Sequence, residues 1–249
     1  MDRRETSLAR GTRAFGSTRW TLVLKAKGEN LTAITKATQV RHDALGKLIE
    51  LYWKPLYFFV RRKGHGVDES KDLVQSFFAT FLEKDFLKSV DREKGRFRTF
   101  LLVALEHFLS NEYDKMRAQK RGGGKRILSL DFDDAETGYS RDPAVHETPE
   151  KLYLRKWARA LTDLAMKMLT DEFAARGKAD LFKAIRPHLA GGDDYESLAK
   201  ELKMTVANLK VTVHRARKRY GAVLREAVRD TVQSDAEVDT ELRELMASL

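Results

Sequence analysis

Apolar residues recur every three or four positions through most of this 249-residue chain, and no long stretch alternates apolar with polar residues. A period of three to four residues is that of an α-helix with one buried face, whereas strict alternation would indicate a β-strand. The pattern therefore predicts an all-α protein. One long helix is expected from about residue 43 to 63, with a kink or a break at Pro55, and another from about residue 96 to 120.

The composition changes abruptly near the middle of the chain. Residues 127–150 hold seven acidic residues and one arginine among turn-forming residues. We therefore expect two small helical domains, a bundle and a helix-turn-helix, joined by an extended acidic linker that DNA would repel but a basic channel in a partner could accept. The expected segments are a flexible basic arm at 1–18, a first domain at 19–126, the acidic linker at 127–148, a second domain at 149–230, and a C-terminal amphipathic helix at 231–249.

The second domain carries the signals of a helix-turn-helix. Asp193 and Glu196 have the spacing of a capping box at the start of a short helix. A three-residue turn at 203–205 follows, and Thr205 is the expected cap of a longer basic helix. The predicted buried stripe of that longer helix is Leu209, Val213, Ala216 and Tyr220.

The stretch KVTVHRARKRY at 210–220 contains five cations, one histidine and no acid. A helix face that only meets solvent normally mixes charges of both signs, so the missing acids favour contact with DNA over a merely soluble face. The start of such a helix faces base edges, and later cations hold phosphates. The candidate duplex-binding residues are Ala207, Asn208, Lys210, Val211, His214, Arg215, Arg217, Lys218 and Arg219.

A second basic cluster lies beside aromatic residues between positions 96 and 121. Unpaired bases stack on aromatic rings while cations hold the backbone, so this cluster suits an opened DNA strand. Phe97 and Phe100 also lie on the apolar stripe of their helix, and a purely structural role for them stays open. The candidate opened-strand residues are Arg96, Phe97, Arg98, Phe100, Tyr113, Arg117, Lys120 and Arg121.

The helix expected at 68–83 has an apolar stripe at Val74, Phe77, Phe78 and Phe81. Its opposite face is polar, which suits either solvent or a protein partner. The candidate partner-binding residues on that face are Asp72, Gln75, Ser76 and Glu83.

Charge and composition narrow the chemistry. A net charge of +10 indicates a polyanionic partner. The chain has no cysteine, its six histidines are scattered, and RGGGKR at 121–126 lacks the Ser or Thr and the preceding strand of a phosphate-binding loop. We therefore expect no enzymatic activity, no cofactor and no metal site. No stretch is apolar enough for a signal peptide or a bilayer span, which predicts a cytoplasmic protein without membrane insertion.

Three motifs resemble those of bacterial RNA polymerase sigma factors of the extracytoplasmic-function type, also called group four. DLVQSFFATFLEK at 72–84 is similar to the region-two helix of that family, and GRFRTFLLVA at 95–104 resembles the start of its promoter-melting helix. YESLAKELKMTVANLKVTVHRARKRY at 195–220 resembles its region-four helix-turn-helix. The chain departs from the family where Phe100 replaces the usual Trp, and where His107 replaces the usual Asn.

The resemblance implies a sigma factor with a region-two bundle and a region-four helix-turn-helix. Its partners would be core RNA polymerase, bound through the polar face of the 68–83 helix, and promoter DNA, which it would recognise and melt to initiate transcription. A regulatory anti-sigma protein is a further partner that the resemblance allows. The alternative function is a helix-turn-helix transcriptional regulator with an N-terminal sensing domain, which would explain residues 193–228 but not the two region-two motifs.

Overall fold

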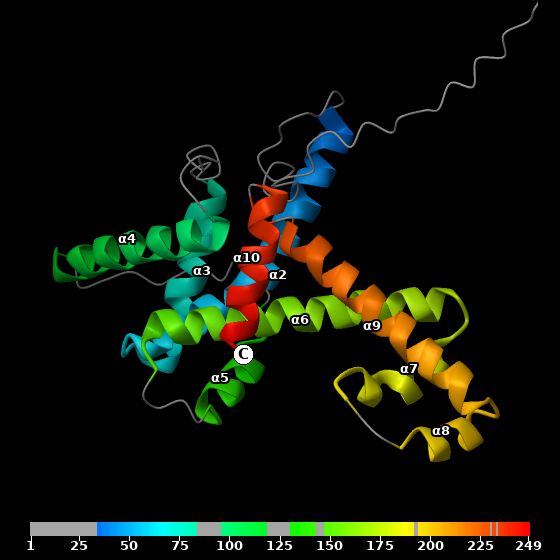
Figure 1. Cartoon of the computed structure of the whole chain (residues 1–249). Helices are drawn as coiled ribbons and strands as arrows, with labels where there is room; N and C mark the ends of the chain where they lie inside the picture. The colour runs from blue at the N-terminus through cyan, green and yellow to red at the C-terminus, as the bar shows by residue number, and fades with distance from the viewer. Residues whose placement is uncertain are drawn as a thin grey trace, which may run out of the picture.

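The computed structural model describes residues 34–83, 96–118, 130–142, 147–191, 194–229, 231–232 and 234–249. These residues contain helices and no strand, which confirms the all-α class (Figure 1). None of the described helices is both long and apolar enough to cross a bilayer. The arm predicted at 1–18 lies outside the described residues. The helices are α2 (Ile34–Arg62), α3 (Val67–Glu83), α4 (Phe97–Ala118), α5 (Phe132–Ser140), α6 (Pro149–Ala175), α7 (Ala179–Ile185), the 3-10 helix η3 (Arg186–Leu189), α8 (Tyr195–Glu201), α9 (Val206–Arg229) and α10 (Asp235–Ala247).

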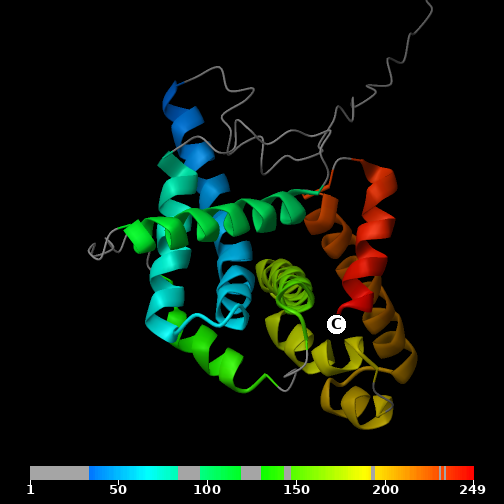
Figure 2. The same ribbon diagram turned by 90° about the vertical axis from the view of Figure 1, so that its left-hand side faces the viewer.

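Helix α6 is the central element of the fold. Figure 2 shows it nearly end-on, with α2, α3 and α5 on one side, α8 to α10 on the other, and α4 crossing above it. It packs along both α2 and α9. The helix begins at Pro149, because the Thr148 side chain accepts a hydrogen bond from the Lys151 N–H at 3.3 Å and Pro149 occupies the first helical position. Trp157 and Leu161 on its inner face are completely buried.

Helix α2 runs without a break through Pro55, so the alternative of two abutting helices is wrong. A proline inside a helix removes one backbone hydrogen bond and clashes with the carbonyl four residues earlier. Here the buried Leu56, Tyr57 and Phe58 directly after the proline keep the second half of the helix in the core. The helix ends where Gly64 adopts a φ of 98°, a conformation that glycine adopts without steric cost.

The acidic segment is not an extended linker where the structure describes it. Residues 132–140 form α5, capped by Asp131, whose side chain accepts a hydrogen bond from the Asp134 N–H at 3.0 Å. Phe132 is buried and packs edge-on against Trp53 and Tyr57 of α2, with ring centroids 5.3 and 5.4 Å apart. The apolar contacts of Phe132, hidden among acids in the sequence, anchor this helix to α2.

The acids of this segment are paired within the molecule. Glu136 accepts hydrogen bonds from the Tyr57 hydroxyl at 2.6 Å and from Nε and Nη2 of Arg61, both at 2.9 Å. The Arg61 guanidinium therefore lowers the pKa of Glu136. Asp134 pairs with Lys54 of α2 at 2.5 Å. These carboxylates match cations of α2, so they are not free to enter a channel in a partner.

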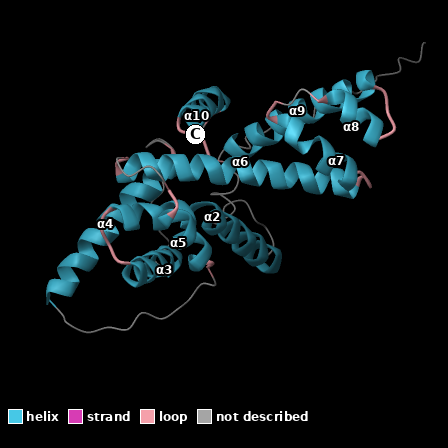
Figure 3. Ribbon diagram, turned by 90° about the horizontal axis from the view of Figure 1, so that it is seen from below, coloured by secondary structure: helices cyan, strands magenta, loops and turns pink. Residues whose placement is uncertain are grey.

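The predicted boundary between two domains does not separate two cores. One apolar cluster joins α2 to α6 with the second half of α9 and with α10, so Tyr52 and Val228 belong to the same core. A smaller cluster holds α7, α8 and the first half of α9 together, around Phe182 and Leu209. Figure 3 shows this smaller part at the end of the molecule opposite α3 and α4. The boundary between the two cores therefore lies within α6 and α9, because each of these helices contributes residues to both cores.

Candidate nucleic-acid interface

Helices α8 and α9 and the turn between them have the layout of a helix-turn-helix. The turn closes α8 with a Met204 N–H to Ala199 O hydrogen bond of 3.0 Å and a Lys203 N–H to Lys200 O bond of 3.2 Å. Lys203 adopts a φ of 52° and takes the left-handed position that glycine often fills. The turn therefore forms although it contains no glycine, because Lys203 takes the left-handed conformation.

The caps of both helices lie close to where the sequence predicted them. The Thr205 hydroxyl accepts a hydrogen bond from the Asn208 N–H at 3.2 Å, as expected of the cap of α9. The cap of α8 is Asp194, which accepts from the Ser197 N–H at 3.1 Å. The prediction of a capping box from Asp193 to Glu196 was therefore one residue out of register, and Asp193 lies outside the described residues.

The buried stripe of α9 is confirmed. Leu209, Val213 and Ala216 are at most 1% exposed and pack in the smaller core. Tyr220 is half-buried, and its hydroxyl donates a 3.3 Å hydrogen bond to the Thr162 carbonyl of α6. Burial of this stripe fixes the rotation of α9 about its axis, and so determines which side chains face outward.

The outward face of α9 is polar and positively charged. Eight of the nine predicted duplex-binding residues are exposed: Ala207, Asn208, Lys210, Val211, His214, Arg215, Arg217 and Lys218. Among the residues that the structure describes, no carboxylate forms an ion pair with Lys210, Arg215 or Lys218. Arg217 uses one guanidinium nitrogen to donate a 2.6 Å hydrogen bond to the His188 carbonyl of η3. The face is thus an uncompensated array of cations, which suits phosphates.

Arg219 is the exception among the predicted phosphate contacts. Its guanidinium pairs with both carboxylate oxygens of Glu172 on α6, with Nε lying 2.8 Å from Oε2. The pairing lowers the pKa of Glu172. Arg219 thus fastens α9 to α6, and its charge is already compensated inside the protein.

Two exposed cations outside α9 were missed by sequence reasoning. Lys183 of α7 and Arg186 of η3 are exposed, and the bond from Arg217 to His188 holds η3 against α9. Their sequence, LFKAIRPH, shows two cations at a spacing of three, but only the packing of η3 on α9 shows that the segment carrying Arg186 lies beside the basic helix.

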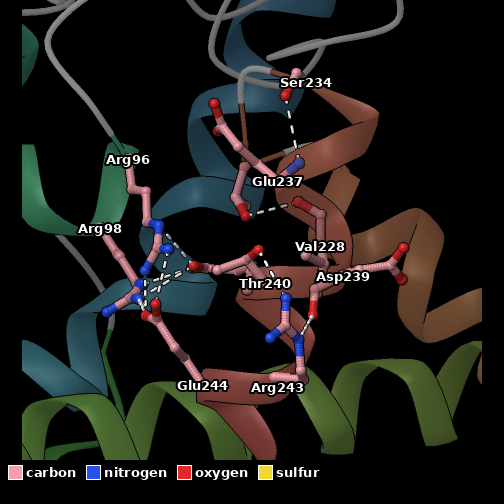
Figure 4. Close-up of polar contacts among 11 residues, drawn as sticks. Arg96, Arg98, Val228, Ser234, Glu237, Asp239, Thr240, Arg243 and Glu244 are labelled. Carbon is pink, nitrogen blue, oxygen red and sulfur yellow. Dashed lines mark hydrogen bonds and ion pairs between the residues drawn. The ribbon is translucent and has the colours of Figure 1, made fainter.

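The predicted opened-strand cluster at the start of α4 is largely covered. Phe97 is 1% exposed and packs edge-on against Tyr52 at 5.4 Å, so its ring is a core residue, and the half-buried Phe100 stacks on it at 6.1 Å. Arg98 is buried above the Trp157 ring, 5.0 Å from its centroid. Both Arg98 and Arg96 form ion pairs with carboxylates of the C-terminal helix α10 (Figure 4).

The remaining members of this cluster are distributed differently. Tyr113 is 61% exposed, a high exposed fraction among the large hydrophobic residues that the structure describes. Arg117 lies in α4, but its side chain is outside the described part of the structure, as are Lys120 and Arg121 entirely. The structure therefore does not bring an exposed ring and exposed cations together at the start of α4 while α10 is in place.

The polar face predicted on α3 is only partly available to a partner. Asp72 is exposed and Ser76 is partly exposed, but Gln75 is buried at 6% exposure. The sequence shows a narrow apolar stripe on α3, and for that reason Gln75 was expected to face outward. The prediction is wrong because the packing of α3 in the fold buries a wider arc of the helix than its apolar residues occupy. The side chain of Glu83, at the end of α3, lies outside the described residues.

The partners of Arg96 and Arg98 were also missed by the sequence analysis, although the pattern of α10 contained the signal. Glu241 lies three residues after Val238 and four before Leu245, both of which are 1% exposed. This spacing places a carboxylate on the buried stripe of an amphipathic helix. A buried acid in that position requires a cation partner.

The described residues contain no group of three His, Asp or Glu side chains that could hold a metal ion. In comparisons with known proteins, no family model matched the chain, no curated protein was similar to it in sequence, and no solved structure matched its fold. The geometry of the molecule therefore has to support any functional assignment.

Proposed function

We propose that this protein is a sigma-type factor that binds core RNA polymerase and directs promoter recognition, DNA melting and transcription initiation. The single observation that carries the DNA-binding part is the outward face of α9, where four exposed cations, from Lys210 to Lys218, lie without an acid among them. A helix-turn-helix presents such a helix to the major groove. The proposal as a sigma factor adds the sequence resemblance of residues 72–84, 95–104 and 195–220 to this geometry.

Within this proposal, the start of α9 meets the bases. Asn208 and Lys210 are exposed in the first turns, where an amide can bind adenine and an ammonium can bind guanine, and exposed Val211 can contact a thymine methyl group. Arg215, Arg217 and Lys218 lie farther along the helix and would hold phosphates. The exposed Lys183 and Arg186 extend the array of cations beyond α9.

The first half of the chain would bind polymerase and the opened strand. Asp72 and Ser76 supply the part of the α3 polar face that remains available to polymerase. For the opened strand, the candidates are the half-buried Phe100 and the exposed Tyr113, with Arg96 and Arg98 once α10 no longer pairs with them. Unpaired bases stacked on such rings gain about 1–3 kcal/mol each, which offsets the cost of a few kcal/mol of leaving the duplex.

A helix-turn-helix regulator remains the second candidate, because one observation favours it. The buried Phe97 and the paired Arg96 and Arg98 leave no accessible opened-strand site at the start of α4 in this conformation. A regulator needs only the duplex-binding face of α9. The two candidates differ in whether the protein can start transcription with core polymerase alone.

The test is transcription in vitro with purified bacterial core polymerase and a pool of promoter fragments. A sigma factor yields discrete transcripts when the protein is the only added factor, whereas a regulator yields them only when a housekeeping sigma factor is also present. Arg215→Ala should reduce the yield of discrete transcripts because it weakens duplex binding, and Lys167→Ala, which removes an exposed cation of α6 outside the helix-turn-helix, should leave that yield unchanged. Absence of any transcript without a second sigma factor would refute the proposal.

A further inference from the structure

Helix α10 closes over the start of α4 and is attached mainly through a few side chains. Val238 and Leu245 are buried against the larger core, while Met246 and Leu249 at its end are more than half exposed. The helix begins at Ser234, whose hydroxyl accepts a hydrogen bond from the Glu237 N–H at 3.3 Å. It contacts α9 and α6. A short helix with two fully buried apolar side chains is one of the less strongly held elements of a fold.

Four charged groups attach α10 to the start of α4. The buried Glu241 carboxylate accepts hydrogen bonds from Arg98 Nε at 2.5 Å and Arg98 Nη2 at 3.1 Å, and lies 3.0 Å from Arg96 Nε. Glu244 accepts from Arg96 Nη2 at 2.8 Å and from Arg98 Nη2 at 2.7 Å. Figure 4 shows both arginines of the α4 region pointing toward α10. Two cations from one element thus meet two anions from another.

The chemistry of this contact is the chemistry by which proteins hold phosphates. A guanidinium binds a carboxylate or a phosphate through the same parallel pair of N–H donors. Glu241 and Glu244 therefore occupy the donors that a nucleic-acid backbone would use. A purely apolar attachment could not be displaced by a polyanion, whereas a charged attachment can be, because the anion replaces the carboxylates one for one.

We propose that α10 is an internal competitor of DNA: its Glu241 and Glu244 carboxylates occupy Arg96 and Arg98, and phosphates of an unpaired strand displace them. The inference rests on the proposed function, which assigns these arginines to the opened strand, and it adds how that site is regulated. In the closed state the site is covered, and in the open state α10 has left α4. A ligand that binds only the open state shifts the population toward it.

The competing explanation is that α10 is a permanent fastener. Two further ion pairs hold α10 to α9 rather than to α4, namely Asp239 with Arg225 at 2.5 Å and Asp235 with Arg229 at 3.0 Å. These pairs provide a matched control, since Asp239→Asn and Glu244→Gln each remove one negative charge from α10, but only Glu244 contacts the two arginines. Glu244 is 48% exposed, so its amide variant leaves no buried charge without a partner.

The experiment measures binding of a fluorescent single-stranded oligonucleotide to the full chain by anisotropy. Glu244→Gln should tighten binding about tenfold, because one charge-assisted competitor is removed. Asp239→Asn should change binding less than about twofold. Adding Arg96→Ala to Glu244→Gln should remove the gain, while affinity for a duplex, bound through α9, should stay unchanged in every variant. Equal effects of Glu244→Gln and Asp239→Asn, or a gain that survives Arg96→Ala, would overturn the proposal.

A second measurement uses the unaltered protein. Hydrogen exchange of the α10 amides should speed up when the single-stranded oligonucleotide is added at saturation, because the helix is displaced. Unchanged exchange in α10 would overturn the proposal even if a variant fails to fold. The outcome is separable from that of the transcription test: a chain that frees α10 on binding a single strand but directs no initiation would refute the sigma-type function alone.

Discussion

The Glu241→Gln substitution tests what the buried charges of α10 contribute to stability. Glu241 is 1% exposed and accepts three contacts from Arg96 and Arg98, and Arg98 is itself only 6% exposed. Glutamine keeps the shape of the side chain but not its charge. Arg98 then retains only Glu244, at 2.7 Å, as an anionic partner.

Two responses to this substitution compete, and their magnitudes are similar. If α10 stays docked, breaking a buried ion pair costs about 3–5 kcal/mol, less the part that Glu244 still compensates. If α10 undocks, Arg98 regains solvent, and the loss is the burial of Val238 and Leu245, about 3–6 kcal/mol for two side chains. The lower of the two costs decides the outcome. We therefore expect a loss of about 3 kcal/mol, with α10 partly released.

The assay combines urea denaturation with hydrogen exchange. Trp157, whose ring lies 5.0 Å from the Arg98 guanidinium, provides a fluorescence signal beside the substitution. The α10 amides should lose most of their protection while those of α6 keep theirs. Glu244→Gln is the control and should cost less than about 1 kcal/mol, because that side chain is about half exposed. A loss below 1 kcal/mol for Glu241→Gln, with α10 still protected, would refute the reasoning.

Three further predictions concern other parts of the molecule. Lys203→Gly should raise the free energy of unfolding by about 0.5–1 kcal/mol, because Lys203 holds a φ of 52° that glycine adopts without steric cost. Lys200→Gly, in the helix before it, should lower the free energy of unfolding, and thermal denaturation that shifts both variants in the same direction would contradict this prediction. Arg61 lowers the pKa of Glu136 in the folded state, so the stabilisation from this pair is lost as the pH falls through that lowered pKa. Glu136→Gln should therefore reduce the loss of stability below about pH 5, and an unchanged dependence of stability on pH in acid would contradict this prediction. Arg215→Ala should weaken duplex binding and reduce the slope of log affinity against log salt by about 1, and an unchanged slope would exclude a phosphate contact at Arg215.

Helical periodicity alone was sufficient to predict much of the local structure. The Thr205 cap of α9, the end of the 68–83 helix at Glu83, and the buried stripe of α9 all match the sequence predictions. Each depends on residues within one or two turns of each other, where backbone geometry and side-chain type determine the outcome. The same locality explains why the turn before α9 was recognised although Lys203 replaces a glycine.

The predictions that failed depended on contacts between segments far apart in the chain. A run of acidic residues predicts a solvated linker unless side chains from another segment pair with the acids. The residues of 131–136 themselves carry no sign that Lys54, Tyr57 and Arg61 of α2 lie opposite them. Gln75 was placed on a free face because the width of a buried stripe depends on how closely the neighbouring helix packs. Arg219 carries a cation like its neighbours, but Glu172, 47 positions earlier, compensates it.

The sequence by itself determined the helical class, the ends of the main helices, and the acid-free face of α9, because these follow from residue type and spacing along one helix. The start of α2, expected near residue 43, lies at Ile34. Only the tertiary structure decided which cations remain uncompensated. Arg96 and Arg98 are paired with Glu241 and Glu244, roughly 145 residues away, while Lys210 and Arg215 face solvent. The physical reason is that Coulomb attraction acts through space over a few ångströms and not along the chain, so its partners are set by packing.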